Sequence, residues 1–340
     1  YWLARFGTTE PVNLMNLETL KRSELHFVGI GGSGMSGLAR IALAMGIKVS
    51  GSDLKDSPTI KELSNLGVKT FIGHKPENLN RDCVLVVSSA IESENVELVR
   101  ARELSLPILT RAEALAIFME GKFAIAIAGT HGKTTTTSML TVAFQSLGLD
   151  PSFAIGGSIA RGGTNAHFGS GNYFVAEADE SDGSFLAYKP NGAVVTNIEL
   201  DHVDNFPNID AILDLFENFV ASIKSGGFLV ICIDGDNQRK LLDQIKRDDL
   251  TIISYGQSSA DLTYSHLYLK PTGAMARIVH GGKILGELET SVPGEHNLLN
   301  ALAVIGVGIA TNQPISELMN GIKNFTGARR RFEIKGEIKG

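Results

Sequence analysis

Short apolar runs alternate with helix-like stretches through most of this chain, and that alternation limits the fold more than any other feature. Amphipathic stretches, such as residues 36–46 and 57–67, separate the apolar runs. A strand, a helix and a following strand close most readily as a parallel sheet covered by helices. The first series predicts strands at residues 25–30, 47–53, 68–73, 83–91 and 106–110.

A second series of the same kind begins at residue 123, after a predicted helix over 111–121. Its further strands are predicted at 173–179, 193–198, 227–233 and 251–256, and its helices at 208–226, 294–310 and 315–325. Residues 262–292 alternate differently, with glycines at two turns, as in an antiparallel ribbon. The predicted fold is α/β: an N-terminal Rossmann-like parallel sheet domain, then a central P-loop ATPase-like α/β domain with a small antiparallel ribbon.

The overall composition excludes several classes of function. A net charge of -6 over 340 residues argues against nucleic acid or an anionic membrane as a partner. Cys83 and Cys232 lie far apart in apolar runs, which is typical of buried thiols in a reducing compartment. No run reaches the roughly eighteen apolar residues of a membrane span, and the first residues lack a signal-peptide pattern. We therefore expect a cytoplasmic protein.

A glycine-rich turn follows the first predicted strand. VGIGGSGMSG places Gly29, Gly31 and Gly34 in the G-x-G-x-x-G spacing, between a strand and a helix. Such a turn brings backbone N–H groups and a helix N-terminus onto a diphosphate. Asp53 ends the next strand, near the place where an acid would meet a ribose. The spacing alone suits a nicotinamide dehydrogenase, but no pattern suggests a hydride-transfer partner, so we predict a diphosphate site whose ligand is open.

A second glycine-rich turn, AIAGTHGKTTTT, begins the second series. Ile127 stands where the standard G-x-x-x-x-G-K-[ST] phosphate loop needs glycine, so the chain matches the shorter G-T-x-G-K-T form at residues 129–134. Successive N–H groups would still curl around an anion at a helix N-terminus. Lys133 would reach the β- and γ-phosphates and the Thr134 hydroxyl would bind Mg²⁺. Four threonines begin a helix poorly, and such a broken local rule often marks a functional site.

Two acidic segments end neighbouring strands of the second series. The first carries Glu177, Asp179, Glu180 and Asp182. The second carries Asn197, Asp201, His202 and Asp204. So many acids at the carboxyl edge of one sheet are costly unless cations meet them, and Glu177 and His202 are the residues we predict as metal ligands. The alternative is that these side chains cap the helices that follow, which suits Asp182 and Asp204 better.

Together these strings resemble the Mur ligases of bacterial cell-wall synthesis. They run in order over residues 27–333: GIGGSGMSG, GSDL, SSAI, RAE, AGTHGKTTTT, GGTNA, EADESDGSF, NIELDHVD, GEHNLLNALA and GARRRFE. Any one string is a weak signal, whereas the whole set in this order is a strong one. EADESDGSF with AGTHGKTTTT is most similar to the member of the family that adds the first amino acid.

The resemblance implies an ATP-dependent carboxylate–amine ligase of peptidoglycan precursor synthesis. UDP-N-acetylmuramate would take the γ-phosphate of ATP on its lactyl carboxylate, and the amine of L-alanine would then displace phosphate from the acyl phosphate. The implied catalytic residues are Lys133, His131, Glu177 and His202. The implied Mg²⁺ ligands are Thr134, Glu177 and His202.

The resemblance also implies two separate nucleotide sites. ATP would contact Gly129, Thr130, His131, Gly132, Lys133, Thr134, Thr135, Asn297, Asn300, Arg330 and Arg331. The UDP-sugar would contact Gly31, Gly32, Ser33, Gly34, Met35, Ser52, Asp53, Ser88, Ser89, Ala90, Arg111 and Asn165. We therefore expect an irregular polar extension (1–24), a UDP-sugar-binding domain (25–118), a central ATP-binding domain (119–326) and a hinge (327–340).

Mur ligases carry a third α/β domain after the arginine motif, and this sequence ends about ten residues past Arg331. If these residues are the whole protein, we expect nucleotides to bind with little or no turnover. Three alternatives stay open on sequence alone. They are a recycling ligase that joins a peptide to the same sugar nucleotide, a nicotinamide oxidoreductase built on GIGGSGMSG, and a nucleotide-binding protein without turnover.

Overall fold

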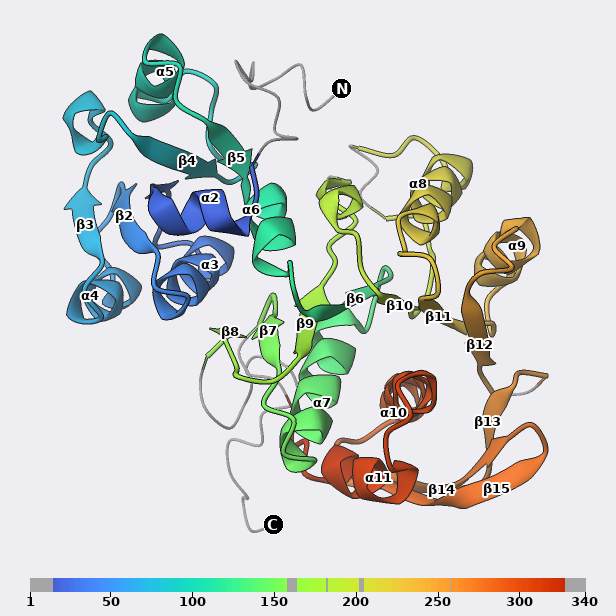
Figure 1. The fold of residues 1–340 in the computed structure, drawn as a ribbon. Coiled ribbons are helices and arrows are strands. Elements are labelled where there is room, and N and C mark those ends of the chain that lie inside the picture. The colour runs from blue at the N-terminus through green and yellow to red at the C-terminus, as the bar shows by residue number, and fades with distance from the viewer. Residues whose placement is uncertain (1–14, 158–163, 182, 202–204, 258, 328–340) are drawn as a thin grey trace, which may run out of the picture. The chain divides into compact units, whose positions relative to one another are not determined.

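The computed structural model describes residues 15–157, 164–181, 183–201, 205–257 and 259–327. These residues divide into two compact units (Figure 1). The described residues up to Gly121, together with Asn165–Phe168, form the first unit, and the remainder from Lys122 onward form the second.

The first unit contains a five-stranded parallel sheet in the order β3-β2-β1-β4-β5. Its strands are β1 (Glu24–Val28), β2 (Lys48–Asp53), β3 (Lys69–Ile72), β4 (Cys83–Val87) and β5 (Ile108–Thr110). The direction in which strands are added reverses between β1 and β4. In open α/β sheets, ligands bind outside the carboxyl ends of the strands at such a reversal. The predicted Rossmann-like parallel sheet is confirmed.

Four helices follow the strands of this sheet. They are α3 (Ser33–Ala44), α4 (Pro58–Asn65), α5 (Val96–Glu103) and α6 (Arg111–Phe118), with a short 3-10 turn η2 (Pro76–Asn78) and a short strand β8 (Ala166–His167) that packs against α3. Local sequence sets the first residue of two of these helices. Ser57 caps α4 ahead of Pro58, and Thr110 and Glu113 form a capping box at α6.

One expectation for this unit is wrong. The polar segment before residue 24 was expected to be irregular, but residues Leu17–Arg22 form helix α2. The side chain of Asn16 accepts a hydrogen bond from Thr19 N, Glu18 lies in the first turn and two basic residues lie in the last. These are the capping and dipole preferences of a helix, and they act in a segment too short to show an apolar period.

The second unit is built on a larger sheet. Nine of its strands lie in the order β15-β14-β13-β12-β11-β10-β6-β9-β7. They are β6 (Phe123–Ala128), β7 (Ser152–Ala154), β9 (Tyr173–Glu177), β10 (Gly192–Val195), β11 (Phe228–Cys232), β12 (Thr251–Tyr255), β13 (Leu262–Lys270), β14 (Gly273–His280) and β15 (Lys283–Thr290). Strands β7 to β12 pair in parallel, whereas β13 to β15 are antiparallel, so the predicted ribbon is confirmed.

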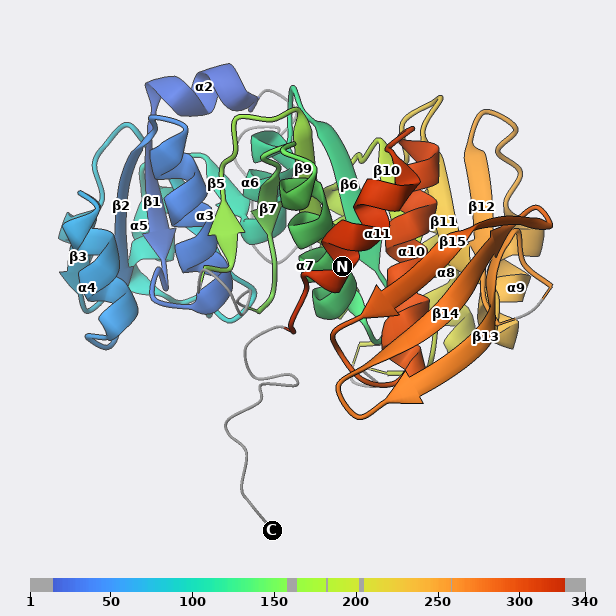
Figure 2. The same ribbon diagram turned by 90° about the horizontal axis from the view of Figure 1, so that it is seen from below.

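Helices cover both faces of the parallel part of this sheet. They are α7 (Lys133–Ser146), α8 (Ile209–Ala221), α9 (Asp236–Gln244), α10 (Glu295–Ala310) and α11 (Ile315–Lys323), with a 3-10 turn η3 (Ser184–Ala187). Figure 1 shows α8 and α9 on one face, and α7, α10 and α11 on the other. Figure 2 shows the ribbon β13–β15 beside α10 and α11.

Helix α10 is the centre of the second core. It is apolar nearly all round, which is the pattern of a helix enclosed by other elements. A Cβ atom added at Gly306 would lie 2.7 Å from Val230, and one at Gly308 would lie 2.2 Å from Leu318. These two glycines therefore let β11 and α11 approach α10 closely.

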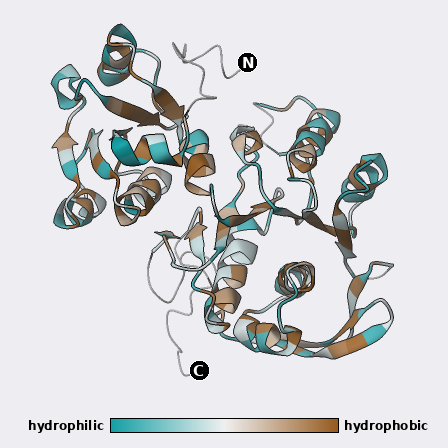
Figure 3. Ribbon diagram, viewed as in Figure 1, coloured by the Kyte–Doolittle hydropathy of each residue, from teal (hydrophilic) through white to brown (hydrophobic). Residues whose placement is uncertain are grey.

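Apolar residues of the strands and of the helices that pack on them form both cores (Figure 3). Cys83 and Cys232 are buried in β4 and β11, and burial raises the pKa of both thiols to about 11. The prediction that both thiols are buried in strands is confirmed. Among the described residues, no helix combines the length and the apolarity needed to cross a membrane.

Candidate active site

The glycine-rich turn of the second unit joins β6 to α7, as predicted. Gly129 has φ +132° and Gly132 has φ +85°, both in the region that favours glycine. A Cβ atom at Gly129 would lie 2.1 Å from Thr196 Oγ1, and one at Gly132 would lie 2.7 Å from Asn300 Oδ1. The two glycines thus serve both a left-handed backbone and a close approach, which a phosphate loop requires.

The segment after β10 holds this loop in place. Asn197 accepts hydrogen bonds from Thr130 N at its carbonyl (3.0 Å) and from His131 N at its Oδ1 (2.7 Å). The Thr196 hydroxyl donates to the carbonyl of His131 at 2.6 Å. These contacts hold the loop backbone through the protein's own hydrogen bonds.

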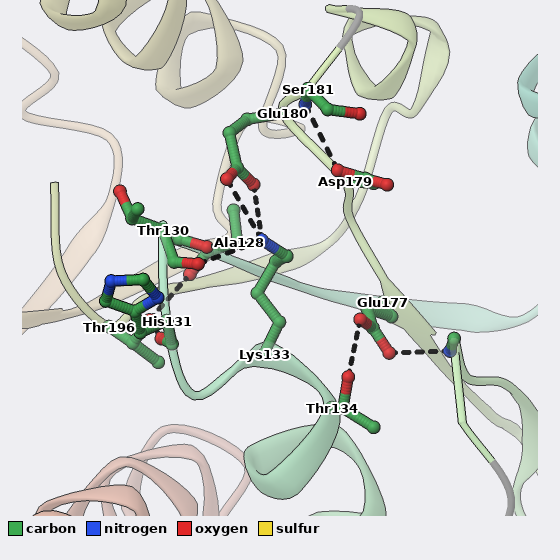
Figure 4. A network of polar contacts seen from close by, with 12 residues as sticks. Ala128, Thr130, His131, Lys133, Thr134, Glu177, Asp179, Glu180, Ser181 and Thr196 are labelled. Carbon is green, nitrogen blue, oxygen red and sulfur yellow. Dashed lines mark hydrogen bonds and ion pairs between the residues drawn. The ribbon is translucent and has the colours of Figure 1, made fainter. Parts of the chain in front are cut away.

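Lys133 begins α7 and points back across the loop (Figure 4). Its Nζ donates to Gly129 O (2.8 Å) and lies 3.0 and 2.7 Å from the two carboxylate oxygens of Glu180. The two side chains are 12% and 4% exposed. Burial raises the pKa of Glu180, and the Lys133 ammonium acts in the opposite direction. The sequence grouped Glu180 with the metal acids, but the structure pairs it with the loop lysine.

The Thr134 hydroxyl donates a 2.8 Å hydrogen bond to Glu177 Oε1 (Figure 4). The other carboxylate oxygen of Glu177 accepts a hydrogen bond from Gly156 N at 2.6 Å. A hydroxyl and a carboxylate oxygen side by side are hard ligands of the kind that Mg²⁺ takes from proteins, with water and phosphate completing its shell. Over the described residues, no group of three His, Cys, Asp or Glu side chains could hold a metal, and His202 lies outside those residues.

The other acids of these two segments have different environments. Asp179 accepts a hydrogen bond from Ser181 N at 3.1 Å, which is a local turn contact. Asp182 and Asp204 lie outside the described residues. Among the described acids at the end of β9, Glu177 and Glu180 therefore contact the phosphate loop, whereas Asp179 makes a local contact.

The remaining predicted ATP residues are spread around the loop. His131 is 65% exposed, with its ring 3.7 Å from the Glu199 carboxylate. Thr135 is buried in the first turn of α7, and Asn300 approaches Gly132 from α10. Asn297 is 1% exposed, and its side-chain amide donates a hydrogen bond to Pro293 O. This amide therefore has a structural role in addition to its predicted contact with ATP. Arg330 and Arg331 lie outside the described residues.

The glycine-rich turn of the first unit joins β1 to α3. Gly31 N donates to Asp53 Oδ2 at 2.9 Å, and a Cβ atom at Gly31 would lie 2.8 Å from that oxygen. The acid at the end of β2 therefore holds the glycine turn directly. Gly29 has φ +78°, and Gly32 is the residue before the first turn of α3.

Other predicted residues of this site gather around the start of α3. The amide of Asn165 donates to Ser33 O at 2.6 Å. The Arg111 side chain lies against Gly34, where a Cβ atom would be 3.1 Å away. Met35 is buried, and the loop after β4 carries Ser88, Ser89 and Ala90. The structure thus brings residues from five separate sequence strings to the carboxyl edge of one sheet.

A buried polar cluster beneath this edge was missed. Glu97, fully buried at the N-terminus of α5, accepts hydrogen bonds from Ser52 Oγ (2.5 Å) and Asn78 Nδ2 (2.6 Å). His26 and His74 lie 3.6 and 3.4 Å from its carboxylate. Burial alone would raise the pKa of Glu97, but these contacts outweigh it and lower that pKa. The only local signal was an Asn-x-Glu at a helix start.

Comparison with known proteins agrees with these observations. The sequence model of the "Mur ligase family, catalytic domain" matches residues 24–123, and that of the "Mur ligase middle domain" matches residues 127–308. The chain is 46% identical over 325 residues to the UDP-N-acetylmuramate–L-alanine ligase of Acidothermus cellulolyticus, covering 95% of this chain and 68% of that protein. It is also 46% identical to the ligase of that name from Geotalea uraniireducens, covering 94% and 69%.

Solved structures show the same fold. The UDP-N-acetylmuramate:L-alanyl-γ-D-glutamyl-meso-diaminopimelate ligase of Neisseria meningitides matches with a TM-score of 0.82 and 28% identity, covering 91% of this chain and 99% of that one. The UDP-N-acetylmuramate-alanine ligase of Thermotoga maritima matches with a TM-score of 0.80 and 29% identity, covering 93% and 71%.

Proposed function

The chain belongs to the Mur ligase family, and on that premise we propose that it joins L-alanine to the lactyl carboxylate of UDP-N-acetylmuramate at the expense of ATP. The observation that carries the proposal is the loop between β6 and α7, where Lys133 and Thr134 begin a helix beside Glu177 and Glu180. That arrangement presents N–H groups, one ammonium and one hydroxyl to a phosphate chain.

The proposed reaction has two steps. A lactyl carboxylate oxygen attacks the γ-phosphorus of ATP, and the bond to the β–γ bridging oxygen breaks to release ADP. The amine of L-alanine then attacks the carbonyl carbon of the acyl phosphate, loses a proton and expels inorganic phosphate. Negative charge builds on the phosphoryl oxygens in the first step and on the carbonyl oxygen in the second. Lys133 would stabilise the first of these charges, and preorganised groups of this kind commonly supply several kcal/mol.

Thr134 and Glu177 are the residues that would hold Mg²⁺, because their hydroxyl and carboxylate oxygens lie 2.8 Å apart at the loop. When bound there, the ion would neutralise phosphate charge. We propose His202 as a further ligand on the family resemblance alone. His131, Asn297, Asn300, Arg330 and Arg331 keep their proposed roles around ATP on the same ground.

We propose the first unit as the UDP-sugar domain. The turn from Gly29 to Gly34 stands at the strand-order reversal and leads into α3, whose N-terminus would attract a diphosphate. Asp53, Asn165 and Arg111 contact this turn from other elements, and the carbonyl of Ser52 accepts a hydrogen bond from Gly29 N. Because ATP and UDP-linked sugars are cytoplasmic metabolites, the cytoplasm is the proposed place of action.

Phosphate release with UDP-N-acetylmuramate and ATP, measured across a panel of amino acids, tests this function. We expect L-alanine to give the highest rate, on this chain or on one extended at its C-terminus. A panel member L-alanyl-γ-D-glutamyl-meso-diaminopimelate tests the recycling reaction, which the fold alone does not separate from the alanine reaction. Preference for that peptide over L-alanine would contradict the proposal.

A further inference from the structure

The ammonium of Lys133 is fully engaged by its own chain. Four oxygens lie within 3.3 Å of Nζ: Gly129 O at 2.8 Å, Thr130 O at 3.3 Å, and Glu180 Oε1 and Oε2 at 3.0 and 2.7 Å. A lysine ammonium has three N–H donors and no more. A phosphate oxygen can therefore accept a hydrogen bond from Nζ only if one of these oxygens gives up its hydrogen bond.

Glu180 is the charged acceptor among these groups. Glu180 is 3% exposed, and its two carboxylate oxygens make two of the four contacts with Nζ. A buried carboxylate needs a cationic or hydrogen-bonding partner, because leaving it unpaired is costly. Lys133 supplies such a partner here, and the pair of charges is electrically neutral beside the phosphate loop.

We propose that Glu180 is a positioning residue that competes with the ATP phosphates for Lys133. The carboxylate holds the lysine folded over the loop carbonyls, where Figure 4 shows the contact, and ATP binds by displacing the carboxylate from Nζ. Part of the attraction between Lys133 and ATP is then used to break the pair with Glu180. The inference rests on the proposed ATP site, and goes beyond it by giving the loop lysine an internal counter-ion.

The competition predicts an unusual sign for a mutation in an active site. Glu180→Gln keeps the size and one acceptor oxygen of the side chain but removes its charge, so Lys133 is freer to meet phosphate. We expect roughly three- to tenfold tighter binding of a non-hydrolysable ATP analogue by calorimetry. Glu180→Asp keeps the charge on a shorter side chain, and should give a smaller gain. A side chain with only a structural role would weaken binding when replaced.

Two controls separate competition from a general charge effect. Glu199→Gln removes an exposed carboxylate that lies near His131 but does not contact Lys133, and it should change the affinity less than twofold. In a Lys133→Ala background, Glu180→Gln should no longer tighten binding, because the ammonium for which the carboxylate and the phosphate compete is absent.

The outcomes are distinct. Tighter binding in Glu180→Gln that vanishes without Lys133 supports the proposal. Unchanged or weaker analogue binding in Glu180→Gln, with Glu180→Asp behaving like the parent chain, overturns it, as does an equal gain in the Lys133→Ala background. If Lys133→Ala itself leaves analogue affinity unchanged, the fault lies in the proposed ATP site rather than in the role of Glu180.

Discussion

The hydroxyl of Thr134, in the first turn of α7, donates a 2.8 Å hydrogen bond to Glu177 at the carboxyl end of β9. The two residues are 43 positions apart in sequence, and the pairing of β6 with β9 brings them together. They supply adjacent oxygens for the proposed Mg²⁺.

Replacing Glu177 should raise the Mg²⁺ requirement. Glu177→Ala removes the carboxylate while leaving the loop backbone, so we expect half-maximal activity at a roughly tenfold higher Mg²⁺ concentration. A metal titration of phosphate release measures this. Asp179→Ala is the matched control, because that acid meets only a local N–H after the same strand. Superimposable Mg²⁺ curves for Glu177→Ala and the parent protein would refute the assignment.

Replacing Gly129 should lower the stability of the protein. Gly129→Ala places a Cβ atom 2.1 Å from Thr196 Oγ1 at φ +132°, so we expect a loss of roughly 2–5 kcal/mol in the free energy of unfolding. Gly148→Ala is the control: its φ is +73° but nothing lies within 4 Å, so about 1 kcal/mol is expected. Urea denaturation measures both. Equal losses would mean that the loop is not packed as described.

Replacing Asp53 should affect the two nucleotide sites differently. Asp53→Ala removes the acceptor of Gly31 N, and we expect about tenfold weaker binding of UDP-N-acetylmuramate with unchanged affinity for the ATP analogue. Asp56→Ala, in the same loop but paired with Lys61 near the surface, should change neither affinity. Calorimetric titrations with each nucleotide measure the effects. Equal weakening for both nucleotides in Asp53→Ala would show that the assignment of two separate sites is wrong.

The Glu97 cluster should make stability depend on pH. The pKa of Glu97 is lowered in the folded protein, so its contribution is present above the ordinary carboxyl value near 4.5 and is lost as pH falls through the folded value. Glu97→Gln should therefore cost about 1–3 kcal/mol at pH 7, with a smaller difference from the parent protein below pH 4. Urea denaturation between pH 3 and 7 measures this.

The control for that series is Glu103→Gln, because Glu103 lies on the same helix and only pairs with Arg100 at the surface. It should change stability by less than about 0.5 kcal/mol at every pH. If the stability difference between Glu97→Gln and the parent protein stays constant from pH 7 to pH 3, the lowered pKa of Glu97 is contradicted.

Local signals predicted much of this molecule. The strand and helix periods predicted both sheets. The glycine spacings located both turns, because Gly129 and Gly132 adopt positive φ values that favour glycine. Element ends were less well predicted. The strand predicted over 83–91 ends at Val87, since Ser88 and the residues after it have left the ladder to form the loop.

The partners of the site residues could not be predicted in the same way. Glu180 meets Lys133 because β9 lies beside β6. Glu97 follows β4, and it meets Ser52, His26 and His74 because the strand order β3-β2-β1-β4 gathers these segments. Such contacts depend on topology, which no local period encodes. The Mur resemblance named Thr134 and Glu177 together, but it gave no partner for Glu180.

The central claim is that Lys133 stabilises the negative charge on the transferred phosphoryl group. The rate of phosphate release with saturating ATP, Mg²⁺, UDP-N-acetylmuramate and L-alanine, compared between the parent protein and Lys133→Ala, tests it most directly. We predict a loss of about 10²-fold or more, as for removal of a charge-stabilising group. A Lys133→Ala rate within about threefold of the parent rate would contradict the account.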